Sequence, residues 1–421
     1  MPIALISAAA VPDRHRDRRL NLPLLTVALA LLCACSHRAP PPSPPPTAQS
    51  LQDGVASLAS AMIARAQLPP PPQSGRYPVT IDPWIDATTG EQVATTRLMQ
   101  TEIETLAPQH FPQLELLPFN QASLERQPLV LLGAIQPVEA PGSFAVVRGE
   151  PGAWRIYGVL ADLKTGRIAA ADSAWVRPQD IDASPVPFYR DSPVWARDES
   201  TEAYLRTSAA HTGDPIDPAY RQNLQAEALL TDAGARYDAR DYAAALALYR
   251  QAAALPQGGH QLRVYNGVYL TTAALGQRQA AAESFGELIG YGLQRQRLAV
   301  KFLFEPGSVT FWPDPAISGA YPMWLREIAN RTADTSACLR VIGHTSTTGA
   351  PAYNDRLSHA RAQRVEAALV AARPALSTRL SVEGNGARDP IVGTGRDDAT
   401  DVLDRRVDFQ LRTCGARLAT R

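Results

Sequence analysis

Cysteine, histidine and net charge are all scarce in this sequence. The 421 residues include only four cysteines and seven histidines, and 41 basic side chains balance 41 acidic ones. No second cysteine or histidine lies at zinc-ligand spacing from Cys338 or Cys414, so we expect neither a metal site nor a cofactor. The lack of a basic excess argues against nucleic-acid binding. No apolar run reaches the ~20 residues that a membrane-spanning helix needs.

The first segment has the features of a targeting signal. Four arginines between positions 14 and 19 precede a short apolar run over residues 20–32. The run ends in Leu32-Cys33-Ala34-Cys35, which resembles a bacterial lipobox, whose cysteine thiol takes diacylglycerol. The resemblance implies a signal peptide over residues 1–34 and a lipid anchor on Cys35. Because Ser36 rather than aspartate follows, it also implies sorting to the outer membrane. Ordinary secretory cleavage nearby is the alternative.

Residues 35–76 are expected to form a tether between the lipid and the first folded domain. The run PPPSPPP at residues 40–46 predicts an extended polyproline segment of ~3.1 Å per residue. Helical spacing over residues 50–67, opened by the capping pair Ser50 and Asp53, predicts one short helix. We favour a flexible spacer without a partner of its own.

Residues 77–200 are expected to form a small α+β domain. Strand patterns occur at residues 79–81, 129–135, 154–163 and 168–176, and a helix pattern occurs at residues 95–106. This order loosely resembles periplasmic lipoprotein domains related to curli-secretion and flagellar accessory factors.

Asp82 and Asp86, in the stretch IDPWID, form a pair of neighbouring carboxylates in this domain. Their spacing would suit acid–base chemistry. However, no nucleophile lies nearby and Pro83 marks a turn, so capping or turn roles are preferred.

Residues 215–296 are alanine-rich and helical, with a weak internal repeat. The pattern of Ala245, Tyr249 and Ala252 resembles the second helix of a tetratricopeptide (TPR) unit, and Ala281 and Phe285 repeat it 36 residues later, against ~34 for the family. Tandem units of that family bind extended peptides, which implies a surface for a protein partner. Two units are fewer than the ~3 needed for independent stability. The helices therefore either bind a partner or only brace the flanking domains.

The most informative stretch is NDRLSHARAQRVEAAL at residues 354–369. On a helix, one face would carry Asn354, Leu357, Ser358, Arg361, Ala362, Val365 and Leu369. Arg361 lies in the middle of this mostly apolar face. A buried charge needs a partner, so either an internal carboxylate or a ligand must meet the guanidinium.

The spacing N-x2-LS-x2-RA-x2-V-x3-L looks like the peptidoglycan-associating motif of the OmpA-like domain family. The resemblance covers residues 298–414 and implies a β-α-β-α-β-β sandwich, with helices against one sheet. The sequence as a whole then predicts an α+β multidomain protein: an N-terminal α+β domain, a helical TPR-like segment and a C-terminal OmpA-like domain.

The same resemblance implies a site for the stem peptide of peptidoglycan. In the family an aspartate takes the ammonium of the peptide's diamino acid, and an arginine takes its carboxylate. Arg361 occupies the arginine position, and Asn354 and Leu357 belong to the same motif. The family loop GHTDxxG reads GHTSTTG here, so Thr345 is retained while Ser346 replaces the aspartate.

Asp404 stands where the family often has asparagine. Its carboxylate either replaces the charge missing at Ser346 or pairs with Arg361. On paper, His344, Ser346 and Asp404 also make a catalytic triad. The family uses this loop for binding, so we do not expect an enzyme.

Cys338 and Cys414 are expected at the ends of two strands. If those strands are antiparallel neighbours, their ends meet and a disulfide forms in an oxidising periplasm. Two free thiols are the alternative.

These patterns together predict an outer-membrane lipoprotein on the periplasmic face. It would bind peptidoglycan non-covalently, link envelope layers and present its helical segment to a protein partner. The alternative is an envelope assembly or scaffold lipoprotein whose OmpA-like domain has lost wall binding. A wall-modifying enzyme is a second alternative, disfavoured by the lack of a convincing nucleophile–base pair.

Overall fold

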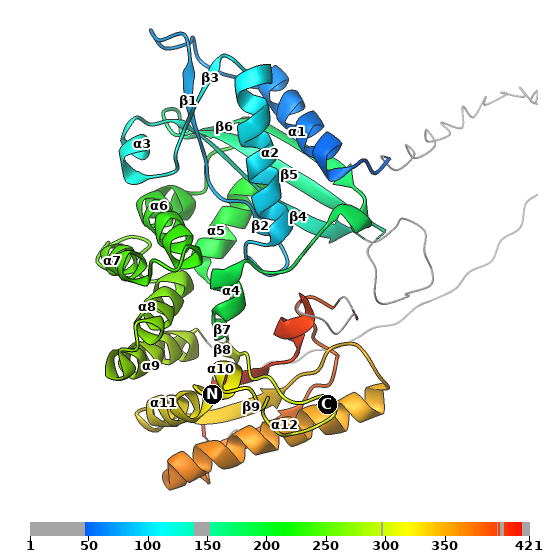
Figure 1. The fold of residues 1–421 in the computed structure, drawn as a ribbon, viewed down its shortest axis with the longest axis vertical. Coiled ribbons are helices and arrows are strands. Elements are labelled where there is room, and N and C mark those ends of the chain that lie inside the picture. Colours follow the sequence, from blue (N-terminus) through cyan, green and yellow to red (C-terminus); the bar gives the residue numbers. More distant parts are fainter. Residues whose placement is uncertain (1–46, 139–151, 296–297, 394, 396–399, 415–421) are drawn as a thin grey trace, which may run out of the picture. The chain divides into compact units, whose positions relative to one another are not determined.

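The computed structural model describes residues 47–138, 152–295, 298–393, 395 and 400–414 (Figure 1). These residues belong to one compact unit that begins at Pro46. The expected signal peptide, the lipidation site at Cys35 and the polyproline run lie outside the described residues. No helix in the described ranges is long and apolar enough to cross a membrane.

The first sheet has six strands in the order β3-β1-β4-β5-β6, with β2 paired to β4. Its strands are β1 (Tyr77–Ile81), β2 (Ile85–Asp86), β3 (Leu114–Leu117), β4 (Leu129–Val138), β5 (Ala153–Asp162) and β6 (Arg167–Val176). The helices between them are α2 (Ala94–His110) and α3 (Gln121–Glu125). Strands β1, β3 and β4 run parallel, and β4, β5 and β6 run antiparallel. The four strands and one helix expected here are all present.

Alternate side chains of β4 enter two different cores, as the period of a strand requires. Leu129 and Leu131 pack with α1 (Leu51–Arg65) and α2 on one face. Val130 and Leu132 pack on the other face with α5 (Glu199–Ser208) and α6 (Pro218–Asp238). The sheet is therefore covered on both sides.

Helix α1 differs from its expected place in a spacer. Its apolar stripe of Leu51, Val55, Leu58 and Met62 is buried in the core of the first sheet. The amide of Gln49 just before it donates to the carbonyl of Trp175 on β6 (2.9 Å). The periodicity predicted the helix correctly, but only the sheet shows what covers its apolar side.

Four helices form two successive helical hairpins: α6, α7 (Tyr242–Ala253), α8 (Leu262–Ala274) and α9 (Arg278–Gln294). The residues of the repeat pattern are buried where these helices pack together, and Tyr249 is 1% exposed. A side chain at Gly267 on α8 would collide with the Tyr249 ring, because a Cβ there would lie 2.3 Å from it. The small and aromatic positions thus set the helix spacing.

The second hairpin packs directly onto the C-terminal sandwich. Phe285 of α9 stacks on Trp324 of α11 (Tyr321–Ala333), with ring centroids 5.4 Å apart. The indole N–H of Trp324 donates to the Tyr269 hydroxyl at 2.7 Å. Both hairpins and the sandwich share one core. These contacts agree with the interpretation that the helices brace the flanking domains.

The second sheet has the order β10-β9-β11-β8-β7. Its strands are β7 (Val194–Trp195), β8 (Leu298–Val300), β9 (Cys338–Gly343), β10 (Leu380–Gly384) and β11 (Val407–Arg412). The helices are α10 (Pro315–Ser318), α11 and α12 (Pro351–Ala372), with short 3-10 turns at Pro374–Leu376 and Thr400–Asp404. Strands β9 and β10 are parallel, and β11 is antiparallel to β9 and β8.

Two details differ from the sequence expectations. Strand β8 ends at Val300, although the alternation of Phe302 and Phe304 predicts a longer strand. Phe302 instead packs against Tyr321, because the chain leaves the sheet there and its apolar side chains still need a core. Residues 194–195, expected in the first domain, form β7 at the edge of the second sheet.

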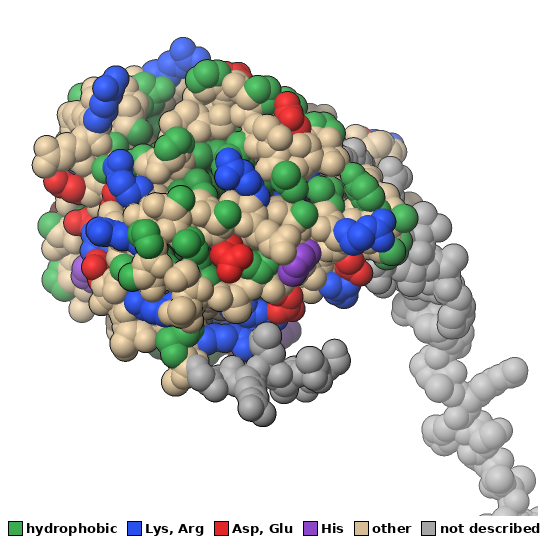
Figure 2. All heavy atoms as spheres, turned by 90° about the horizontal axis from the view of Figure 1, so that it is seen from below, with side chains coloured by type: hydrophobic (Ala, Val, Ile, Leu, Met, Phe, Trp, Pro, Cys, Tyr) green, Lys and Arg blue, Asp and Glu red, His purple; other side chains and the backbone are tan. Residues whose placement is uncertain are grey.

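Acidic and basic side chains are interspersed on the face seen in Figure 2, and neither sign gathers into a patch there.

Candidate functional site

Helix α12 carries the motif and buries the face that its periodicity predicts. Its buried residues are Asn354, Ser358, Arg361, Ala362, Val365 and Leu369. Leu357, on the same predicted face, is only half-buried. The helix begins with Pro351, whose fixed φ suits a first helical position. The helix lies beside β9, β10 and α11 (Figure 1).

Arg361 is held by the loop that follows β8. Its Nε donates to the carbonyl of Ser308 (3.1 Å) and its Nη2 donates to the carbonyl of Glu305 (3.2 Å). Its Cζ lies 4.8 Å from the centroid of the Phe304 ring, a cation–π contact. The side chain is 5% exposed. The guanidinium is therefore oriented by backbone acceptors and an aromatic face.

The loop between β9 and α12 lies against the motif helix. Asn354 donates from Nδ2 to the carbonyls of Thr348 (2.8 Å) and Ser346 (3.4 Å). The amide of Thr345 donates to the carbonyl of Gly386 (2.9 Å). The Ser346 and Thr348 hydroxyls are 2.9 Å apart. The motif asparagine thus positions the loop that carries Thr345 and Ser346.

Asp404 has a structural role that the sequence did not predict. Its Oδ1 accepts from the amides of Ile391 (2.6 Å) and Val392 (2.9 Å), and its Oδ2 accepts from the amide of Gly393 (2.8 Å). Burial raises the pKa of this carboxyl, and the three amide hydrogen bonds only partly offset that effect. Both carboxylate oxygens of Asp404 accept hydrogen bonds from the backbone of residues 391–393. We therefore do not expect Asp404 to replace the charge missing at Ser346.

His344, Ser346 and Asp404 do not assemble as a triad. Nε2 of His344 lies 3.2 Å from Oδ2 of Asp408 on β11. The Ser346 hydroxyl is engaged with Thr348, and the Asp404 carboxylate with three amides. The three side chains therefore serve separate local networks.

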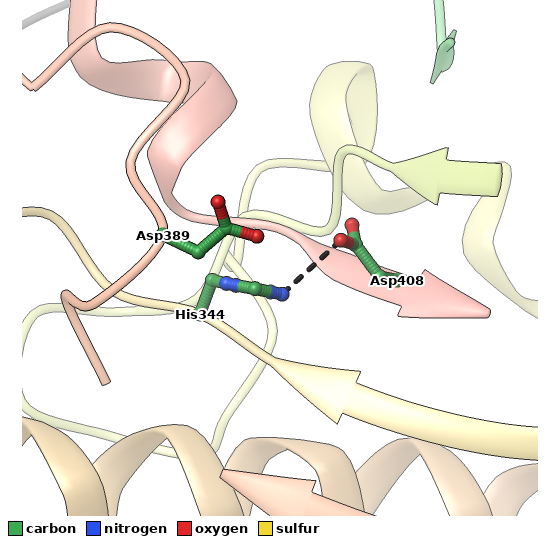
Figure 3. A group of neighbouring side chains, drawn as sticks. All are labelled: His344, Asp389 and Asp408. Carbon is green, nitrogen blue, oxygen red and sulfur yellow. Dashed lines mark ion pairs between the residues drawn. The ribbon is translucent and has the colours of Figure 1, made fainter. Parts of the chain in front are cut away.

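Asp408 and Asp389 lie close to His344 (Figure 3), and the amide of His344 donates to the carbonyl of Arg406 (3.0 Å). Sequence reasoning did not propose any of these three neighbours as site residues. Nε of Arg406 lies 2.9 Å from Oδ1 of Asp408, and Nη2 lies 3.6 Å from Oδ2 of Asp389. Burial raises the pKa of Asp408, but His344 and Arg406 outweigh it and the net shift is downward. The one available signal was the outward position of Asp408 between Val407 and Phe409, whose side chains are buried.

The paired carboxylates of the first domain have turn and tertiary roles. Oδ1 of Asp86 accepts from the amide of Thr88 (2.7 Å), and Oδ2 of Asp82 accepts from the Tyr220 hydroxyl (2.7 Å). Both are 3% exposed. Burial raises the pKa of Asp82 to about 7 and that of Asp86 to about 6.

A disulfide joins Cys338 and Cys414, whose Cα atoms are 5.0 Å apart. It lies where antiparallel β9 and β11 end together, since Arg412 pairs with Cys338 in the sheet register. The bond lies at the end of β9 opposite the loop that carries Thr345 and Ser346, because Gly343 at the other end of β9 leads into that loop.

Residues 303–401 match the model of the OmpA family, so the C-terminal part of the chain contains an OmpA family domain. No curated protein matches the sequence. This match confirms the OmpA-like domain that the sequence motif predicted at the C-terminus. The predicted fold class, with mixed α and β structure, is also confirmed.

Several solved structures are similar over about a quarter of the chain. The peptidoglycan-associated lipoprotein of Burkholderia pseudomallei is 22% identical, over 27% of this chain and 89% of that chain, with a TM-score of 0.23. The cell wall anchor of the type VI secretion system of Pseudomonas aeruginosa is 24% identical, over 28% and 80%, with a TM-score of 0.23. The periplasmic domain of Helicobacter pylori MotB is 19% identical, over 28% and 76%, with a TM-score of 0.24.

Proposed function

We propose that this chain is an outer-membrane lipoprotein that binds the stem peptide of peptidoglycan non-covalently through its OmpA family domain. The observation that carries the proposal is the position of Arg361. It lies on the motif helix α12 of a domain that matches the OmpA family, and two loop carbonyls orient its guanidinium. A preoriented guanidinium suits a carboxylate, because it loses little freedom when the ligand binds.

The recognition chemistry at the ammonium end differs from the family pattern. The Ser346 and Thr345 side chains bring hydroxyls but no charge, and Asp404 is committed to the loop at residues 391–393. A neutral acceptor forms a weaker hydrogen bond to an ammonium than a carboxylate does. We therefore propose weaker binding than in family members that retain the aspartate, with Arg361 dominating the affinity.

The second candidate function is a scaffold whose OmpA family domain no longer binds the wall. The replacement of the aspartate by Ser346 favours it, as does a cavity on the helical hairpins. Half-buried Tyr265 stacks there on buried Tyr291 at 4.7 Å, and Arg295 lies over the Tyr291 ring at 4.8 Å. The two tyrosines line this cavity of about 460 Å³ with Val264 and Val268. A partly aromatic cavity of this kind suits an anchoring side chain of a protein partner.

A sacculus pulldown separates the two candidates. The full-length chain in detergent is incubated with purified sacculi and sedimented, and then eluted with soluble stem peptide. Retention that the peptide reverses supports wall binding. Absence of retention, together with loss of a cross-linked protein partner in a Tyr265→Ala variant, supports the scaffold.

The lipid anchor is tested separately. Cys35→Ala is expected to move the protein from the membrane fraction to the soluble periplasmic fraction, because acyl chains contribute ~0.8 kcal/mol per buried CH₂. Cys33→Ala is the matched control and should leave the protein in the membrane fraction. Equal fractionation of the Cys35→Ala variant and the parent protein would contradict the anchor.

A further inference from the structure

Three potential metal ligands from different segments of the chain lie close together beside the loop that follows β9. His344 follows β9, Asp408 lies on β11 and Asp389 lies in the loop after β10 (Figure 3). One ligand atom from each lies within 4.8 Å of the other two. The histidine spacing along the chain could not reveal this group, because its three members come from three different segments.

The imidazole of His344 is the central group of this cluster. It is 2% exposed, and its Nε2 lies 3.2 Å from Oδ2 of Asp408. Despite that proximity, neither ring nitrogen makes a hydrogen bond of acceptable geometry to the described residues. A buried polar atom without a well-formed hydrogen bond is costly, so a partner for this ring in addition to the Asp408 carboxylate would be favourable.

Arg406 forms ion pairs with both aspartates of the cluster. Its Nε donates to Oδ1 of Asp408 (2.9 Å) and its Nη2 donates to Oδ2 (3.3 Å), and the same Oδ2 lies 3.2 Å from Nε2 of His344. Hydrogen bonds to a carboxylate ligand are a common way to orient it.

Water has access to the cluster from one side. The Asp389 side chain is 58% exposed, whereas that of Asp408 is 20% exposed. Asp389 and Asp408 line a cavity of about 170 Å³, and Arg197, Arg406 and Gln410 are among its other lining residues. That space is enough for the water ligands that complete a coordination sphere.

We propose that His344, Asp389 and Asp408 bind one divalent transition-metal ion, and that Zn²⁺ fits best. One imidazole nitrogen and two carboxylate oxygens, with water at an open position, are a donor set that Zn²⁺ accepts. Mg²⁺ prefers oxygen ligands and suits the imidazole poorly. The bound ion ties the loop that carries Asp389 to the sheet, directly before Thr345 and Ser346. This site does not depend on the proposed peptidoglycan binding.

Titration calorimetry of the chelator-treated full-length chain with Zn²⁺ tests the site. Asp389→Asn is the informative variant, because this exposed loop residue is outside the hydrophobic core and its replacement should leave the fold intact, which circular dichroism checks. We expect it to lower Zn²⁺ affinity at least tenfold. Asp389→His retains a ligand and should keep the affinity within a few-fold of the parent protein.

Two controls identify binding elsewhere on the surface. Asp334→Asn removes an exposed aspartate of the same domain, and His211→Gln removes an exposed histidine beside Asp214. Both should leave Zn²⁺ binding unchanged. Equal Zn²⁺ affinity in Asp389→Asn and the parent protein would overturn the proposal. So would equal affinities for Mg²⁺ and Zn²⁺.

Discussion

The guanidinium of Arg361 lies over the ring of Phe304, with Cζ 4.8 Å from the ring centroid. Phe304 belongs to the loop whose carbonyls at Glu305 and Ser308 also accept from this side chain. One loop therefore fixes both the plane and the depth of the guanidinium. A cation held in this way has a fixed orientation in the ligand-free protein.

Replacing Arg361 tests the site directly. Arg361→Ala should lower sacculus retention roughly 10- to 150-fold, because a charge-assisted hydrogen bond contributes about 1.5–3 kcal/mol. Arg361→Lys keeps the charge but not the forked geometry, and should recover only part of the binding. Circular dichroism checks that each variant is folded.

Arg364→Ala is the matched control for Arg361→Ala. Arg364 is one turn further along α12, is exposed, and lies over the Phe311 ring at 5.5 Å. Its loss should leave retention unchanged. Unchanged retention by a folded Arg361→Ala protein would contradict the proposed role of Arg361.

Ser346→Asp should strengthen binding. The substitution restores a carboxylate at the family position, and Asp404 is engaged with three amides and does not compete for the ligand's ammonium. We expect roughly a tenfold gain in sacculus affinity, the size of one charge-assisted contact.

Two further measurements qualify the Ser346→Asp result. Ser346→Ala should bind no more tightly than the parent protein. Because position 346 is 5% exposed, an added carboxylate there should also lower the melting temperature of the ligand-free protein. A loss of affinity in Ser346→Asp would indicate that another carboxylate already meets the ammonium.

The disulfide should stabilise the sandwich strongly. Cys338 and Cys414 are separated by 76 positions, and closing a loop of that size contributes about 4 kcal/mol in the chain-entropy model. Cys338→Ser/Cys414→Ser should therefore unfold at lower denaturant concentration. Reductant should shift the parent protein by a similar amount and leave the double variant unchanged. Equal midpoints for the two proteins would contradict this role.

Asp82 should make stability depend on pH. Burial raises its pKa to about 7 in the folded state, although the Tyr220 hydroxyl and Arg263 partly oppose the shift. Below about pH 4 the group is protonated in both folded and unfolded chains, so its stabilisation is complete. The stabilisation is lost as pH rises through about 7, because the unfolded chain releases the proton more readily.

Asp82→Asn should remove this part of the pH dependence. At pH 8 the variant should melt at a higher temperature than the parent protein, and at pH 4 the difference should shrink. Asp86, whose pKa burial raises to about 6, should leave a residual slope in the variant. Asp334→Asn is the exposed control. Parallel melting curves for Asp82→Asn and the parent protein between pH 4 and pH 8 would count against the assignment.

Local patterns in the sequence determined much of this protein. The 3.6-residue period of α12 predicted its buried face with Arg361 in the middle, because helix geometry maps spacing onto a face. Strand patterns likewise predicted β4, β5 and β6. The spacing of seven motif positions indicated the OmpA family, and residues 303–401 match it.

Tertiary structure alone decided where the polar groups point. The sequence offered two roles for Asp404, to replace the charge missing at Ser346 or to pair with Arg361. Neither predicted that its carboxylate accepts hydrogen bonds from the amides of residues 391–393. His344, Asp389 and Asp408 meet only because β11 lies beside β9 and the loop after β10 returns to them. Likewise, α1 is part of a core because the first sheet covers its stripe. Hydrogen bonds and burial between distant segments depend on the folded backbone, which spacing along the chain does not encode.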